Sequence, residues 1–344
     1  DERDRQLGTL SQWMDISTFD RDNGEIVVMG TTSQGGASTL VDSRAVQFEY
    51  ENANQLGATA EPDRYPEAVS DPTTTLDSSA GGKLGALFDL RDSTLTDFHR
   101  DVDRLAQSVR DRLNAAHNQG TFANEGASPV TGSIDVTGDA MTFAATDGGD
   151  AVLRINVVQA DGTVRAAETV NFSVPGIAAD ASPAALETYM DGQLTDVDVS
   201  YSANGQLVLT ATTPGESLTV DTNNVTVGGN QTPGGEVRGF SHYFGLNNLF
   251  ETPNLTYDTT NPNWDVTNAA HDLRLRSDIA ADPALLSRGR ASADAGAQAV
   301  AGGDNATANA LAAAFETGGD IARGGKLPAI QDVKLADYAG DLLS

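Results

Sequence analysis

The chain contains no cysteine, and this absence excludes several kinds of chemistry at once. Without thiols there are no disulfide bonds, no thiolate nucleophiles and no cysteine-based zinc sites. Aromatic residues make up only 6% of the 344 residues, so the cores must be built mainly from Ala, Val and Leu. No run of eighteen apolar residues occurs, so the sequence predicts no membrane-spanning helix.

Basic residues are scarce relative to acidic ones. Lys plus Arg is 21 and Asp plus Glu is 49, which gives a net charge of 21 − 49 = −28. Nucleic acids and anionic membranes are both bound through cationic side chains, so we expect neither as a partner. The charge favours solubility and makes copies of the chain repel one another except at specific interfaces.

Motifs that carry catalysis are missing too. The sequence has no HExxH, no GxSxG and no GxxxxGK[ST], and Gly81-Gly82-Lys83 is interpreted as the flexible start of a helix. His99 and His117 lie eighteen positions apart on one expected helix, about 27 Å, so they cannot share a metal ion. We therefore predict no enzyme, no catalytic, cofactor-binding or metal-binding residues, and no cofactor. His242 is expected to be a packing or hydrogen-bonding residue among aromatics.

Two alternatives stay open at this point. Asp147 to Asp150 and Gly302 to Asp304 place carboxylates beside flexible glycines, as calcium loops do, although turn chemistry alone explains both. The chain could accordingly be a secreted acidic adhesin with a calcium-binding or glycan-binding module. A hydrolase using paired carboxylates is the weaker alternative, because a chain this acidic brings some carboxylates together by chance.

The longest regular pattern runs from Gly81 to Asn118 and predicts one long amphipathic helix. Its apolar residues recur at steps of about three and four, which is the helical period. We expect these residues to form the structural core of the long helix: Leu84, Leu87, Phe88, Leu95, Phe98, Val102, Leu105, Val109 and Leu113. The charged residues fill the opposite face: Arg91, Asp92, Arg100, Asp101, Asp103, Arg104, Arg110 and Asp111. Such a helix needs a partner helix.

The composition changes around the long helix. Short strands are expected in 24–50, followed by an extended polar loop at 51–80. From 131 to 233 charges become rare, and alternating apolar residues predict strands joined by Gly turns, with one short helix started by Ser182-Pro183. Later residues predict a strand near Leu273, helices within 304–315 and 335–343, and a loop at 318–327. An aromatic cluster is expected from Phe240, Tyr243, Phe244, Leu246 and Phe250.

These patterns predict an α+β fold. We expect a helix-rich discontinuous domain with long amphipathic helices and a short β-hairpin region, and a β-rich domain inserted into it. The expected divisions are 1–125 for the first helical part, 126–237 for the inserted β-rich domain and 238–344 for the second helical part. Because the chain starts with DERDRQL, which is typical of a helix interior, and lacks an initiator Met, we also expect it to be a fragment.

Four stretches resemble the family of flagellar hook-filament junction proteins (hook-associated protein 1). GGKLGALFDLRD is similar to the family's GG-(K/R)-LGALLDLRD signature, with Phe88 where Leu is usual. FSHYFGLNNLF resembles its FSxYFGLNDLF stretch, with Asn248 where Asp is usual. DERDRQLGTLSQWMD and LRLRSDIAADPALL are similar to two further family segments, and the four occur in the family's order.

The resemblance implies a structural role at the junction between the flagellar hook and filament, by subunit packing and not by catalysis. It implies an extracellular, secreted protein of the bacterial flagellum, needed for motility and flagellum assembly. The implied partners are further copies in a ring, the hook protein, and the second junction protein or flagellin. It also implies an export chaperone for a C-terminal region, and terminal coiled regions that are both absent from this chain.

Overall fold

The computed structural model describes residues 2–31, 36–42, 44–46, 68–71, 74–121, 129–222, 224–229, 236–252, 268–292, 294–322 and 324–343. The chain divides into two compact units. The first contains Asp1–Asp101 and Gly324–Lys326, and the second contains Val102–Arg323 and Leu327–Ser344. Helices and several small antiparallel sheets make up the described part of both, so the predicted α+β fold class is confirmed.

The first unit begins with a helix and a small sheet. Helix α1 (Glu2–Trp13) leads into an antiparallel sheet ordered β1-β2-β3. Its strands and those of a following hairpin are β1 (Ile16–Asp20), β2 (Ile26–Thr31), β3 (Ala37–Val41), β4 (Ala68–Asp71) and β5 (Thr74–Leu76). The sequence predicted β2 and β3 but missed β1, which pairs with β2 across the Gly24 turn. Residues 47–50, at the end of the region 24–50 where strands are expected, and most of the expected loop at 51–80 lie outside the described residues.

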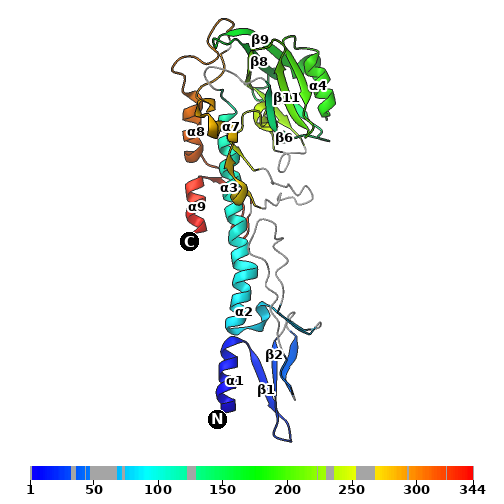
Figure 1. The fold of residues 1–344 in the computed structure, drawn as a ribbon, viewed down its shortest axis with the longest axis vertical. Coiled ribbons are helices and arrows are strands. Elements are labelled where there is room, and N and C mark those ends of the chain that lie inside the picture. Colours follow the sequence, from blue (N-terminus) through cyan, green and yellow to red (C-terminus); the bar gives the residue numbers. More distant parts are fainter. Residues whose placement is uncertain are drawn as a thin grey trace. The chain divides into compact units, whose positions relative to one another are not determined.

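One apolar cluster holds this unit together. Met14, Val28, Leu40, Leu76 and Phe88 are buried in it, and they come from the residue after α1, the sheet, β5 and the helix that follows, while Leu7 and Leu10 of α1 pack against them. Because these side chains come from segments far apart in the sequence, the cluster fixes the sheet against the two helices. Figure 1 shows α1 beside β1 and β2, with the next helix above them.

The expected long helix is present, with a local change in its winding. A 3₁₀ turn (Ser78–Ala80) leads into α2 (Gly82–Asp89), a π-helical segment (Leu90–Thr94) and α3 (Leu95–His117). Gly82 has φ +55°, and an added Cβ would lie 2.7 Å from the carbonyl carbon of Trp13, so only glycine fits there. The π-helical segment contains one extra residue per turn, which rotates later side chains by about 100° around the axis.

This rotation corrects the expected apolar stripe. Phe88 and Leu113 are buried, and four further members are half-buried: Leu84, Val102, Leu105 and Val109. Leu87, Leu95 and Phe98 are instead 54%, 40% and 45% exposed, whereas the polar Thr96 is buried. A strict period of three and four assumes one uninterrupted α-helix, and the π-helical segment at 90–94 breaks that assumption for Leu95 and Phe98, which follow it. Leu87 precedes this segment and is exposed on α2 itself. The stripe is therefore not one continuous core.

The second unit contains a β-rich domain built of three antiparallel sheets, ordered β10-β11-β6, β12-β8-β9 and β14-β13-β7. Its strands are β6 (Val130–Asp135), β7 (Thr142–Ala145), β8 (Val152–Val158), β9 (Val164–Asn171), β10 (Val197–Tyr201), β11 (Gln206–Ala211), β12 (Ser217–Asp221), β13 (Val225–Gly228) and β14 (Arg238–Gly239). Along β11 burial alternates residue by residue, so one face of the strand is in the core. Figure 1 shows β8, β9, β11 and β6 close together, with α4 beside them.

Helix α4 (Pro183–Asp191) begins as the sequence predicts. The Ser182 hydroxyl accepts a hydrogen bond from the backbone N–H of Ala185, and Pro183 occupies the first helical position. Leu186 and Met190 are fully buried in the core of the β-rich domain. The helix therefore covers one side of that core with its apolar face.

The expected aromatic cluster lies mostly in the same core. All five residues of α5 (Phe240–Phe244) are buried, and Phe240, Tyr243, Phe244 and Leu246 belong to the core cluster of the β-rich domain. The Phe240 and Phe244 ring centroids are 4.8 Å apart. Phe250 is half-buried and packs in a different cluster with Leu113. Helix α5 thus packs against the strands although it follows the expected division at 237/238, and the three sequence divisions stay predictions.

The remaining elements surround the second part of α3. They are β15 (Phe250–Glu251), α6 (Ala269–Asp272), β16 (Arg274–Leu275), α7 (Ser277–Ala281), a 3₁₀ turn (Pro283–Leu285), α8 (Ala306–Glu316), β17 (Gly319–Ile321), β18 (Ile330–Val333) and α9 (Leu335–Leu342). The sequence predicted α8, α9 and the strand at Leu275, and it missed β17 inside an expected loop. Figure 1 shows α8 and α9 alongside α3. The apolar clusters here are small.

Candidate functional site: a buried polar joint on helix α3

The polar face of α3 is the least expected part of the structure. The sequence pattern predicts a charged outer face for Asp103, Arg104 and Arg110, but all three are buried, as is Asp101 in the first unit. Asp101, Asp103 and Arg110 bond to backbone groups or polar side chains of distant segments. Arg104 donates to Gln107, three residues further along the same helix. A buried charge or amide is stable only when such partners satisfy it. The sequence pattern is right about which residues share a face and wrong about what covers that face.

Asn114 makes the densest set of contacts. Its Oδ1 accepts hydrogen bonds from the backbone N–H groups of Leu249 (2.8 Å) and Phe250 (2.9 Å), and its Nδ2 donates to the Phe250 carbonyl (2.9 Å). The Asn114 side chain thereby satisfies backbone groups of two consecutive residues, as a neighbouring strand would do in a sheet. Hydrogen bonds weaken steeply with distance and angle, so Asn114 fixes the position of this segment along the helix.

One turn further on, Asn118 extends the same row. It donates to the Asn114 carbonyl (2.8 Å) and to Asn248 Oδ1 (2.8 Å), and its own Oδ1 accepts from the backbone N–H of Asn247 (3.0 Å). Asn248 in turn donates to the Ser133 hydroxyl on β6 (2.9 Å). A continuous path of hydrogen bonds therefore runs from α3 to the first strand of the β-rich domain.

His117 joins a third segment to this row. Its Nε2 accepts a hydrogen bond from the backbone N–H of Ser287 (2.9 Å), so the ring proton sits on Nδ1 and is donated to the Asn247 carbonyl (2.7 Å). The Asn247 amide nitrogen lies 2.6 Å from the Ser287 hydroxyl and 2.9 Å from the Gly120 carbonyl. We call this set the polar joint: Asn114, His117, Asn118, Asn247, Asn248 and Ser287.

The electrostatics of the joint favour the neutral imidazole. Burial lowers the pKa of His117 to about 4, and the positive charge of Arg276 acts in the same direction. The hydrogen bond to the Asn247 carbonyl and the charge of Asp278 oppose this shift. His117 therefore serves as a two-way hydrogen-bonding residue at neutral pH, with one donor and one acceptor nitrogen.

Other polar residues of α3 cap backbone ends in the second unit. Asp103 accepts from the backbone N–H groups of Asn268 (3.0 Å) and Ala270 (2.8 Å), at the start of α6. Arg112 donates to the carbonyls of Gly319 (2.7 Å) and Val333 (3.0 Å), on neighbouring strands β17 and β18. Both contacts tie segments that follow the β-rich domain in sequence back to α3.

An ionic cluster lies beside the joint. Arg110 Nη2 is 2.7 Å from Asp111 Oδ1, and Arg238 approaches the same carboxylate. Burial alone would raise the pKa of Asp111, but Arg110 and Arg238 lower it below its ordinary value. Burial and Arg238 lower the pKa of His242 to about 3. These groups line a cavity of 430 Å³, and they stay in fixed charge states near neutral pH.

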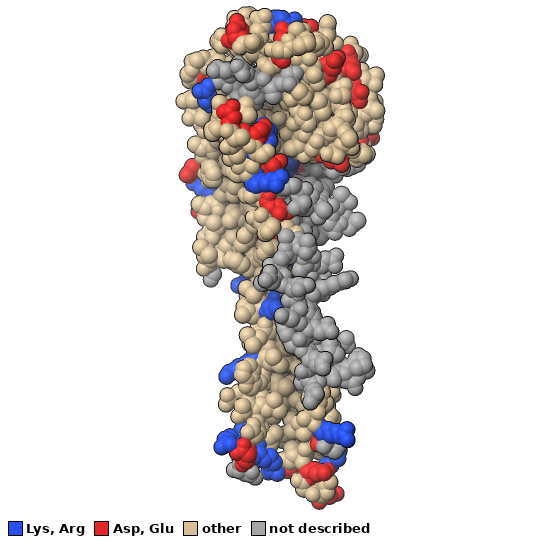
Figure 2. Space-filling model, viewed as in Figure 1, with Lys and Arg blue, Asp and Glu red and all other residues tan. Residues whose placement is uncertain are grey.

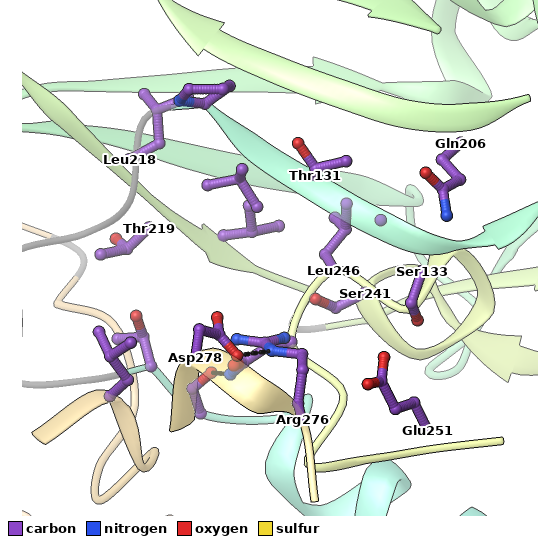
Figure 3. A pocket seen from close by; sticks show the side chains of 18 of the residues that line it. Thr131, Ser133, Gln206, Leu218, Thr219, Ser241, Leu246, Glu251, Arg276 and Asp278 are labelled. Atoms are coloured by element: carbon purple, nitrogen blue, oxygen red, sulfur yellow. Dashed lines mark hydrogen bonds and ion pairs between the residues drawn. The ribbon is translucent and has the colours of Figure 1, made fainter. Parts of the chain in front are cut away.

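A second cavity of 350 Å³ lies against β6, β12 and α7. Figure 3 shows Thr131, Ser133 and Gln206 from the strands on one side, and Arg276, Asp278 and Glu251 on the other. Arg276 Nε donates to Asp278 at 2.7 Å, so these opposite charges neutralise each other. Among the residues that line this cavity, no nucleophile is hydrogen-bonded to a base that would activate it.

The possible calcium residues serve in turns. Asp147 Oδ1 accepts from the backbone N–H of Gly149 (3.0 Å), and Asp304 accepts from those of Ala306 and Arg290 (both 2.9 Å). In the described parts of the chain no group of three or more His, Asp and Glu side chains is placed to hold a metal ion.

Figure 2 shows acidic and basic side chains interspersed over the face in view. None of the described helices has the length and apolar character that crossing a membrane requires.

Sequence reasoning missed the joint because its signal is weak. Asn114, Asn118, Asn247 and Asn248 look like ordinary surface residues, and nothing local pairs residues about 130 positions apart. A usable signal was present in the helix itself. Asn has a low helix propensity, and two of them four residues apart on one face indicate side chains that bond outside the helix.

The fold and the joint define a structural class: an α+β chain whose long helix carries polar side chains that bind distant backbone. Residues 1–129 match the family model described as the "Flagellar hook-associated protein FlgK helical domain". Over these residues the chain is similar to the helical domain of flagellar hook-associated proteins, and the predicted resemblance to hook-associated protein 1 is confirmed.

Among solved structures, the flagellar hook junction protein FlgK from Burkholderia pseudomallei is similar at 17% sequence identity, with a TM-score of 0.27. The match covers 73% of this chain and 44% of that chain, so this chain spans less than half of that protein. A comparison with curated proteins gives no match.

Proposed function

We propose that this chain is a structural subunit of the bacterial flagellum at the junction between hook and filament, and that it acts by subunit packing and not by catalysis. The observation that carries the proposal is the family match over residues 1–129, which contain the whole long helix on which the joint is built. Its place would be outside the cell, after export. The proposed partners are further copies in a ring, the hook protein, and the second junction protein or flagellin, with a chaperone during export.

The polar joint supports this role physically. Two segments bond directly to α3 at the joint, namely the return from the β-rich domain at 247–250 and the chain at Ser287. Asn248 links the start of the β-rich domain to them through Ser133. Apolar packing alone allows side chains to slide by fractions of an ångström, whereas directional hydrogen bonds hold one register. A subunit between two assemblies of different geometry needs this kind of fixed register within itself.

The experiment is restoration of motility by the full-length parent of this chain in cells that lack their own junction protein. We expect swimming and filaments attached to hooks, seen by electron microscopy. The Asn114→Ala variant should reduce both, and His271→Gln, at an exposed histidine, should not. If the full-length parent is exported and neither binds hook ends nor restores swimming, the proposal is wrong.

A further inference from the structure

A short stretch of the second unit crosses back to the β-rich domain after the chain has left it. Residues 294–299, which we call the strap, lie between α7 and α8 in sequence. The Gly296 N–H donates to the Val164 carbonyl on β9 (2.7 Å), and the Val164 N–H donates to the Ala297 carbonyl (2.8 Å). Figure 1 shows this part of the chain in orange, reaching the β-rich domain beside β9 before it returns to α8.

The strap extends the sheet ordered β12-β8-β9 at its β9 edge. Thr163 and Gln298 lie opposite each other as an antiparallel pair, and the Ala299 N–H donates to the Gly162 carbonyl (2.8 Å). Backbone groups at the exposed edge of a sheet need partners of this kind, because they are otherwise open to pairing with another chain. The strap therefore supplies strand pairing to the first residues of β9 from a distant part of the sequence.

The strap is held by few contacts besides these backbone bonds. Its apolar cluster has three buried members, Val158, Val164 and Ala299, whereas the core of the β-rich domain takes side chains from every sheet. No apolar side chain of the strap is larger than alanine, and residues 294–296 are exposed. Local opening costs least where little apolar surface is buried and backbone bonds lie near solvent. The strap should therefore open at a lower cost than the β-rich domain unfolds.

The strap and the polar joint hold the same domain at two different sheets. The joint reaches Ser133 on β6, in the sheet ordered β10-β11-β6, whereas the strap bonds to β9. The piece of chain that carries the strap is itself fixed to α3 a few residues earlier, where the Ser287 N–H donates to His117. A single attachment leaves a domain free to turn about it, and a second attachment on another sheet removes that freedom.

We propose that the strap is a latch. Closed, it fixes the orientation of the β-rich domain relative to the part of α3 that carries the polar joint. It opens while the β-rich domain and the joint stay folded, and the domain then turns about the joint as about a hinge. The inference goes beyond the proposed function and does not rest on it, because it concerns a motion within one chain.

Native-state hydrogen exchange of the whole chain tests whether the strap opens separately. The amides of Val164 and Ala299 are broken together when the strap leaves β9, so we expect them to exchange at a common rate. That rate should be at least about tenfold faster than the rate of the Ile155 amide in β8. Equal protection at all three amides would overturn the proposal, because the strap would then open only when the whole domain unfolds.

A proline in the strap should open the latch. Gly296 has φ +82°, which proline cannot adopt, and its N–H is a donor to β9. We expect Gly296→Pro to speed exchange at Val164 and Ala299 about a hundredfold while β8 keeps its protection. The matched control is Gly215→Pro, in the turn between β11 and β12, where φ is +85° and an added Cβ also meets nothing within 4 Å. Equal acceleration by the two variants would contradict the latch.

A disulfide bond should lock the latch closed. The chain has no cysteine of its own, so Thr163→Cys with Gln298→Cys gives one defined pair. The hydrogen bonds lie between the neighbours of these residues, and Cα atoms in such a pair are about 4.5 Å apart, within the range that a disulfide spans. Oxidation should slow exchange at Val164 and Ala299 at least about tenfold, and a reductant should reverse it. A pair that does not close within single chains, or that leaves exchange unchanged, would overturn the proposal.

Spin labels test the orientation of the domain. Ser200→Cys places one on an exposed position of β10, and Ala312→Cys places the other on α8, whose Leu311 packs in the same cluster as Leu113 of α3. Pulsed electron paramagnetic resonance should give one narrow distance distribution, to which Gly296→Pro adds a second, broader component and Gly215→Pro does not. A distribution unchanged in Gly296→Pro would overturn the proposal if the strap amides had lost protection, because the strap would then open without freeing the domain.

Discussion

The β-rich domain and the polar joint are both in the second unit, and they are stabilised in different ways. The β-rich domain has one large apolar cluster that takes side chains from every sheet, from α4 and from α5. Around α3 the apolar clusters are small, and buried Asn, His, Asp and Arg side chains supply most of the specific contacts. Apolar burial is strong but non-directional, whereas buried hydrogen bonds add little net stability and much geometric selectivity.

This difference in stabilisation shows which segments need side-chain hydrogen bonds to hold their position. A strand keeps its register through its own ladder of backbone hydrogen bonds, so the β-rich domain can leave its core to apolar packing. The segments at 247–252 and 268–289 have very short strands and little ladder of their own in the described residues. The side chains of α3 supply the missing partners for them.

The largest loss of stability should come from a substitution in the apolar core of the β-rich domain. Leu153→Ala removes a fully buried side chain near the start of β8, and we expect a loss of about 4 kcal/mol in the free energy of unfolding. Urea denaturation followed by circular dichroism would measure it. Thr169→Ala, exposed on the adjacent β9, is the matched control and should change stability little. A small loss for Leu153→Ala would show that this core is not the main source of stability.

The second effect breaks the joint. Asn114→Ala leaves two backbone N–H groups and one carbonyl without their partner in a buried site, so we expect a loss of about 3 kcal/mol. Hydrogen exchange should also become faster at Leu249 and Phe250, while the amides of β8 keep their protection. Equal acceleration in both regions would contradict the separation drawn here, because it would make the joint and the β-rich core one cooperative element.

The third effect sharpens the comparison through pH. The folded-state pKa of His117, about 4, lies below its ordinary value of 6.5, so the unfolded chain binds more protons in this range. The stability linked to His117 is full above pH 6.5 and is lost as the pH falls toward 4. Between pH 7.5 and 5.5, wild type should lose about 1 kcal/mol more than His117→Gln. His271→Gln, at an exposed histidine, should follow wild type.

The smallest effect concerns the stripe on the long helix. Phe98→Ala should cost less than about 0.5 kcal/mol, since the side chain is half-exposed, whereas Leu113→Ala should cost about 3 kcal/mol. Thermal unfolding of the two variants measures the contrast. Similar losses at both positions would mean that the π-helical segment does not rotate the stripe as described.

Much of the fold could be predicted from the sequence where the signals are local. Alternation along β11, the Ser182-Pro183 start of α4 and the period of the long helix each depend on neighbouring residues alone. The π-helical segment at 90–94 has no such signal, because LRDST is compatible with an ordinary helix. The joint could not be predicted either. Its partners are distant in sequence, and most of them are backbone N–H and C=O groups, which every residue type carries.

One departure from the family pattern gains a meaning from the structure. Asn248 stands where Asp is usual, and its amide accepts from Asn118 while donating to Ser133. An ionised Asp at this position could accept both bonds but donate neither, so the Ser133 hydroxyl would have to turn and become the donor. The substitution therefore changes which group supplies the proton but leaves a hydrogen-bonded path possible.

The three hydrogen bonds of Asn114 also decide how the molecule responds to mechanical load. An apolar interface under shear can creep, because each small displacement exchanges one van der Waals contact for another of similar energy. Bonds of 2.8 to 2.9 Å cannot stretch by an ångström and survive, so the segment at 249–250 stays in place until its bonds break together. Such an attachment is stiff, and under load it yields in one step instead of loosening gradually.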